Sequence, residues 1–177
     1  MFAMKRVHVL PIAALFLGLA ILAPSHSTTL AQDEQPIDLP CVTGVTAQTL
    51  GVGMPDNANG QALVLLHLTV APAGGFAPHT HPGMMVVSVE SGTIDVTQIG
   101  DMEMTVTRAA SNGTPGATEP LTNGMTATLH PGDSFVEPAG MVHTAFNNGS
   151  DPATLLATGL IDPNQPATQC VDGTPTS

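Results

Sequence analysis

Three histidines near two segments rich in glycine and proline are the residues of this chain best suited to chemistry. His79 and His81 are two positions apart, so on a β-strand both side chains project from one face. His143 follows the turn-forming segment 138–140 and would supply a third imidazole. Neutral imidazoles are common ligands of first-row metals. The pattern therefore predicts a site for one divalent metal ion.

Two carboxylates near these histidines could add an oxygen ligand. Strand alternation places the apolar side chains of Met85, Val87 and Val89 on one face of their segment and Glu90 on the other face. Glu90 is therefore a poor candidate. Glu137 stands directly before Pro138, and the turn there leaves its direction undetermined. Solvent exposure is the default for a lone glutamate. The alternative is that Glu137 points inward as a base or a metal ligand.

The rest of the chain predicts strands and turns. Short runs rich in valine, isoleucine, threonine and leucine alternate with glycine, proline and asparagine, which is typical of an antiparallel sandwich or barrel. The expected strands are Cys41 to Leu50, Ala62 to Ala71, Met84 to Glu90, Thr93 to Ile99, Met104 to Arg108, Met125 to Leu129, Ser134 to Val136, Val142 to Phe146 and Thr154 to Ile161. Segments 90–93 and 147–150 are predicted hairpin-type turns, and 109–122 a surface loop.

Two motifs in this order resemble those of the cupin superfamily. Segment 132–147 matches the second cupin motif, G-x5-P-x-G-x2-H-x3-N, at every fixed position. Segment 74–92 is similar to the first motif, G-x5-H-x-H-x3,4-E-x6-G, with two departures. Gly74 lies one residue closer to His79 than the motif asks, and Met85 replaces the glutamate. The resemblance implies an all-β, jelly-roll-like antiparallel barrel of two facing sheets over residues 62–162.

The resemblance also implies that His79, His81 and His143 converge inside the barrel, next to a pocket for a small molecule. The glutamate of the family is a fourth metal ligand, so Met85 defines the kind of site. Met85 could pack in the barrel, act as a soft ligand that favours copper, or mark a site that binds a ligand without metal. We expect packing, because thioether ligation demands more of the geometry.

The two ends of the chain predict export. Basic Lys5 and Arg6 precede an apolar run and small residues, which is the order of a signal peptide over residues 1–31, cleaved after Ala31. An uncleaved membrane anchor is the alternative. Residues 32–61 are expected to hold an N-terminal strand or extended segment, and 163–177 a C-terminal tail. Since an even pair of cysteines in an exported protein favours a disulfide, we expect Cys41 and Cys170 to be bridged.

Charge and composition limit the partners. The formal net charge is −11, and after removal of the leader Arg108 is the only lysine or arginine left. So acidic a chain is repelled by nucleic acid and by anionic membrane surfaces. We therefore expect no nucleic-acid partner and no membrane insertion after signal removal. Cupins commonly pair through the edges of their barrels, so the resemblance implies a homodimer. A monomer is the alternative.

Two classes of function remain open at this stage. The first is a metalloenzyme, an oxygenase or isomerase that acts on a small organic molecule, with the metal as Lewis acid or oxygen-binding centre. The second is a non-catalytic protein that binds a small ligand or a metal. The residues leave the metal open among iron, zinc, manganese and copper.

Overall fold

Most strands of this protein alternate between buried and more exposed residues, as a sheet with one face in a core requires. A computed structural model describes residues 39–114 and 116–172, and these contain strands and no α-helix. The predicted signal peptide, with its cleavage after Ala31, lies outside the described residues. The strands are β1 (Val42–Gly53), β2 (Ala62–Thr80), β3 (Gly83–Ser91), β4 (Ile94–Ile99), β5 (Met104–Thr107), β6 (Thr118–Leu121), β7 (Thr126–Leu129), β8 (Ser134–Glu137), β9 (Val142–Phe146), β10 (Ala153–Ile161) and β11 (Gln169–Cys170).

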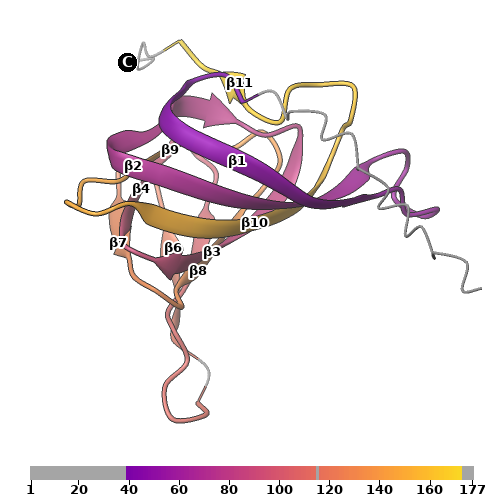
Figure 1. The fold of residues 1–177 in the computed structure, drawn as a ribbon. Coiled ribbons are helices and arrows are strands. Elements are labelled where there is room, and N and C mark those ends of the chain that lie inside the picture. The colour runs from indigo at the N-terminus through magenta and orange to yellow at the C-terminus, as the bar shows by residue number, and fades with distance from the viewer. Residues whose placement is uncertain (1–38, 115, 173–177) are drawn as a thin grey trace, which may run out of the picture. The chain divides into compact units, whose positions relative to one another are not determined.

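All strand pairs are antiparallel, and the long strand β2 joins two groups of strands into a barrel. The hydrogen-bonded order is β6-β5-β8-β3-β10-β2-β9-β4-β7, with β1 and β11 also paired to β2. The first half of β2 pairs with β10, and its second half pairs with β9. Figure 1 shows β1, β2 and β10 running side by side. The prediction of an all-β, cupin-type barrel is confirmed.

A bend in β2 carries the strand from one group to the other. Buried Asn147 holds the bend, because its side-chain amide donates to the carbonyls of Val70 (3.0 Å) and Asp151 (2.8 Å). Gly75 lies against β9 so closely that a side chain there would collide with the Ala145 carbonyl. The asparagine and the glycine therefore place the end of β2, where His79 lies, beside β9.

Three details of the predicted elements were wrong. Segment 109–122, predicted as a loop, contains β6, which pairs with β5. Polar and proline residues hide this edge strand, because strand propensity depends on pairing context. β2 continues nine residues past Ala71 to Thr80. Segments 90–93 and 147–150 are turns, but they link strands that pair with other partners, so neither closes a hairpin.

The two ends of the described chain are joined beside the barrel. Cys41 and Cys170 form a disulfide, with 5.5 Å between their Cα atoms. β1 lies within the predicted segment 32–61, and β11 lies within the predicted tail, where it pairs with the end of β2. Among the described residues, no helix could cross a membrane.

Candidate metal centre

The three histidines of the sequence analysis meet at one point inside the barrel. His79 of β2 and His143 of β9 are directly opposite each other in the antiparallel pair. His81 follows the last residue of β2, and its ring centroid is 4.9 Å from that of His79. One ring nitrogen from each histidine lies within 4.8 Å of the others. His79 and His143 are almost fully buried, at 2% and 1% exposure.

Backbone carbonyls fix the orientation of all three rings. Nδ1 of His79 donates to the Ala77 carbonyl (2.8 Å), and Nδ1 of His81 to the Ala167 carbonyl (2.7 Å). Nδ1 of His143 donates to the Met141 carbonyl (3.2 Å). In a neutral imidazole, a hydrogen on Nδ1 leaves a lone pair on Nε2. The contacts therefore prepare the three Nε2 atoms as acceptors or as metal ligands.

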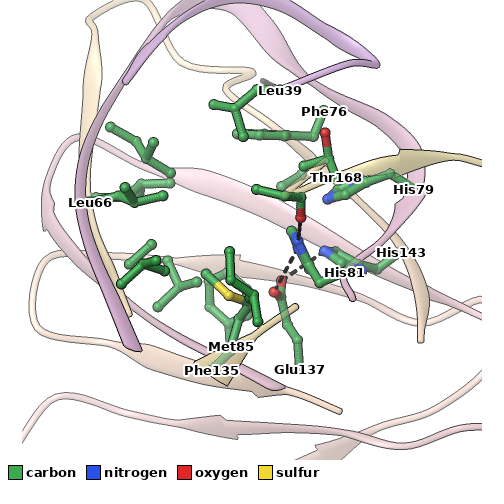
Figure 2. A pocket seen from close by; sticks show the side chains of 18 residues that line it. Leu39, Leu66, Phe76, His79, His81, Met85, Phe135, Glu137, His143 and Thr168 are labelled. Carbon is green, nitrogen blue, oxygen red and sulfur yellow. Dashed lines mark hydrogen bonds and ion pairs between the residues drawn. The ribbon is translucent and has the colours of Figure 1, made fainter. Parts of the chain in front are cut away.

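Glu137, whose direction the sequence left open, points into this cluster. It ends β8 and is 3% exposed. Its Oε1 lies 2.8 Å from Nε2 of His143, and its Oε2 lies 3.1 Å from Nε2 of His81. The default expectation of exposure is wrong, because these two imidazoles offset the cost of burying the carboxylate. Figure 2 shows both contacts as dashed lines.

The carboxylate enters the site from the strand next to the one that the first motif predicts. Met85 of β3 stands at the position of the motif glutamate, and its partner across the β3–β8 pair is Glu137. Paired residues on adjacent strands share one face of a sheet. The inward carboxylate is thus displaced by one strand, from β3 to β8, while both side chains still face the barrel interior.

Met85 packs in the barrel wall. Its side chain is 4% exposed, and its sulfur rests against Gly159 of β10, where any side chain would collide with it. Gly159 and Met85 are partners in the β3–β10 pair. The missing side chain at Gly159 makes the space that the thioether fills, as expected of a gap-filling methionine.

Burial and charge shift the pKa values of His79 and His81 in opposite directions. Burial, with the nearby His143 and His81, lowers the pKa of His79 to about 3. Burial acts in the same direction on His81, but the hydrogen bond and charge of Glu137 outweigh it and raise the pKa of His81. Although burial opposes ionisation of Glu137, its contacts with His143 and His81 lower the pKa of the carboxyl. The site thus favours an ionised carboxylate beside neutral His79.

The contacts of Glu137 create a conflict that a cation resolves. If Nδ1 carries the hydrogen, the Nε2 lone pair of a neutral histidine faces a carboxylate oxygen, and the two acceptors repel. Either an added proton or a metal ion between them removes the repulsion. The N···O distances of these two contacts are 2.8 and 3.1 Å.

The histidines line one side of a pocket in the barrel (Figure 2). The pocket has a volume of about 550 Å³ including its mouth. Leu66 lies across from the labelled histidines, and Met85 and Phe135 lie together at another wall. The lining residues are Leu39, Val64, Leu66, Leu68, Phe76, His79, His81, Met85, Val87, Phe135, Glu137, His143, Ala145, Leu155, Ala157, Ile161, Ala167 and Thr168.

Sequence reasoning missed the part of the site that comes from the chain ends. Ala167 supplies the carbonyl for His81, and Thr168 donates through its hydroxyl to the Pro40 carbonyl (2.7 Å). Leu39 also lines the pocket. These residues carry no motif. The available signal was the predicted bridge from Cys41 to Cys170, which brings both ends to the same place.

Two further histidines and Arg108 lie apart from the cluster. His67 pairs with Glu90 (3.0 Å) at a partly exposed position, and His130 is exposed. Arg108 contacts Asp133 (2.9 Å) and Glu119, which hold its charge away from the pocket. His67, Arg108 and His130 are partly or fully exposed and do not line the pocket.

Comparison with known proteins agrees with the fold and the motifs. A family model described as Cupin matches residues 46–175.

Germin-like protein subfamily 1 member 20 of Arabidopsis thaliana is 30% identical over 122 residues, which cover 68% of this chain and 47% of that protein. The rhicadhesin receptor of Pisum sativum is 31% identical over 123 residues, 66% of this chain and 43% of that protein. The chain spans less than half the length of these two relatives. A solved oxalate oxidase superposes with a TM-score of 0.49 at 20% identity, over 75% of this chain and 57% of that one. The chain belongs to the cupin family.

Proposed function

We propose that this cupin is an exported protein that binds one divalent metal ion beside a pocket for a small organic molecule. The ligands are Nε2 of His79, His81 and His143, with the carboxylate of Glu137 as a fourth. The observation that carries the proposal is the buried contact of Glu137 with two imidazoles whose Nδ1 atoms already donate to carbonyls. An oxygen ligand beside three nitrogens suits Fe²⁺, Mn²⁺ or Zn²⁺ better than Cu⁺.

Each residue has a separate role in this proposal. The three carbonyls that accept from Nδ1 keep the rings in place before the metal arrives, so little order is lost on binding. Glu137 lowers the net charge of the loaded site by one. Met85 fills space against Gly159 and does not bind the metal. A bound divalent ion would supply Lewis acidity at the pocket wall.

Export is supported by the Cys41–Cys170 disulfide and by the leader-like order of residues 1–31. Disulfides persist in oxidising compartments and are rare in the cytosol. We therefore place the mature protein in a periplasmic or extracellular space. A homodimer remains a prediction. The described surface offers an apolar row for it on β2, β10 and β3, formed by Leu63, Leu160 and Met84 at 46%, 36% and 53% exposure.

A catalytic role, as an oxygenase or isomerase, goes one step further than metal binding. The pocket walls offer few groups that could move a proton, apart from the metal centre itself. This shortage favours either simple Lewis-acid chemistry at the metal or a non-catalytic binding role. Turnover of a bound organic molecule by the loaded protein would decide between the two.

Metal-edge X-ray absorption of protein loaded with Zn²⁺ tests the ligand set. We expect nitrogen and oxygen neighbours at about 2.0–2.2 Å, with multiple-scattering features from three imidazoles. In Glu137→Gln the imidazole features should remain while the oxygen contribution changes. A first shell that contains sulfur, or fewer than three imidazoles, would contradict the assignment.

A further inference from the structure

The walls of the pocket are almost wholly apolar. All lining side chains apart from the three histidines, Glu137 and Thr168 are aliphatic, aromatic or methionine. They come from several strands of the barrel, including Val64 and Leu66 on β2 and Leu155 on the neighbouring β10. Such walls stabilise the apolar part of a ligand by removing it from water. They offer no compensation for a charge.

Apart from Glu137 and the Nε2 atoms, which face the proposed metal, the few polar groups of the pocket are already engaged. The Thr168 hydroxyl donates to Pro40, and each histidine donates through Nδ1 to a backbone carbonyl. Glu137 is surrounded by imidazoles. Within residues 39–114 and 116–172, Arg108 is the only lysine or arginine, and it pairs with Asp133 and Glu119 instead of lining the pocket. The pocket therefore has a single place for a polar ligand group, which is the metal.

The net charge of the loaded site further restricts the class of ligand. A divalent ion with Glu137 and three neutral imidazoles carries one net positive charge, which one anionic oxygen group can balance. We propose that the ligand of this cupin is a small molecule with one metal-binding oxygen group and an apolar body, and that a dicarboxylate is rejected. The second carboxylate would lie among Val64, Leu66 and Leu155 without a partner. This inference rests on the proposed metal site.

Protein loaded with Co²⁺ allows the proposed metal site and the proposed ligand class to be tested separately. The visible absorption of Co²⁺ reports occupation of the histidine site, and its change reports a carboxylate that binds there. We compare acetate, which has the head group alone, with 4-methylpentanoate, which adds an apolar body, and with succinate, which adds a second charge. We expect 4-methylpentanoate to bind at least about tenfold more tightly than acetate. Succinate should bind no more tightly than acetate.

A matched pair of variants on β2 locates the effect. Val64 lines the pocket, whereas Val70 faces the same side of the strand and is fully buried outside it. Val64→Thr adds a hydroxyl with little change of volume, so it should reduce the advantage of 4-methylpentanoate over acetate by at least about threefold. Val70→Thr carries the same chemical change and should leave that advantage intact.

Each outcome bears on one claim. If Co²⁺ binds but 4-methylpentanoate gains nothing over acetate, or if succinate binds most tightly, the ligand class is wrong while the metal site stands. Equal loss of the advantage in Val64→Thr and Val70→Thr would also contradict the assignment to this pocket. If Co²⁺ does not bind at the histidines, the proposed function fails and this inference fails with it.

Discussion

His79 and His81 are two positions apart in the sequence, yet their surroundings shift their pKa values in opposite directions. Burial and two neighbouring imidazoles bring the pKa of His79 to about 3, while the contact with Glu137 raises the pKa of His81. As the pH falls, His81 gains its proton above its ordinary value of about 6.5, and His79 stays neutral. Under the proposed metal binding, the ion would displace a proton from His81 at a pH at which His79 is already neutral.

We expect an NMR titration of metal-free protein from pH 8 to pH 4 to show this difference directly. The ring nitrogen shifts of His81 should report protonation with a midpoint above 6.5, and those of His79 should remain those of a neutral ring. Metal affinity should accordingly weaken as the pH falls through the pKa of His81. Protonation of His79 near pH 6.5 would contradict the burial argument.

The role of the Glu137 carboxylate in metal binding is tested by removal of its charge alone. Glu137→Gln keeps the shape but leaves a neutral amide beside the imidazoles, so metal affinity should fall by at least about tenfold. The pKa of His81 should fall as well. Glu90→Gln is the matched control, because Glu90 pairs with a histidine outside the metal centre. Calorimetric metal titration of the two variants should separate them, and equal affinities would exclude Glu137 as a ligand.

At the scale of elements, the β3–β8 pair decides which strand delivers the carboxylate. Met85→Leu nearly conserves volume, so it should cost less than about 1.5 kcal/mol of stability and leave metal affinity unchanged. Glu137→Met should weaken metal binding, and the exchange Met85→Glu with Glu137→Met should recover part of the loss. Denaturant unfolding and metal titration measure both effects. A selective loss of Cu⁺ in Met85→Leu would instead identify the thioether as a ligand.

The disulfide connects the chain ends to the metal centre through β11. Cys170 pairs with His79 in the β2–β11 ladder, and the carbonyl of Ala167 orients His81. Cys41→Ser with Cys170→Ser should lower the melting temperature, because the bridge closes a loop of 129 residues and contributes on the order of 4–5 kcal/mol. The same change should weaken metal binding as His81 loses its support. A lower melting temperature with unchanged metal affinity would show that the bridge acts on stability alone.

Sequence reasoning predicts a strand or a site residue correctly where the local residue pattern is enough to determine its contacts. Spacing identified His79 and His81, and the second motif identified His143, whose position opposite His79 follows from strand pairing. The direction of Glu137 could not be predicted, because it depends on the register of the β3–β8 pair, in which Glu137 lies opposite Met85. β6 was missed for the same reason. Its pairing with β5 is a tertiary contact that its own composition does not reveal.

At the scale of the whole molecule, the barrel brings distant parts of the chain to one buried centre. β2, β8, β9 and the segment before β11 each supply a residue of the histidine–glutamate cluster or a group that orients one. The order of the two motifs was enough to predict this architecture, since the family resemblance fixes the fold. The chain ends that complete the pocket are held there by the disulfide and by pairing of β1 and β11 with β2.

Metal analysis of protein purified from the exported fraction tests the central claim most directly. Inductively coupled plasma mass spectrometry, combined with equilibrium dialysis against Zn²⁺, Mn²⁺ and Fe²⁺, should find close to one divalent ion per chain. The variant with His79→Ala, His81→Ala and His143→Ala should bind none at the same free metal concentration, while His67→Ala, which alters a histidine outside the centre, should bind as the wild type does. Stoichiometric metal retained by the triple variant would contradict the account.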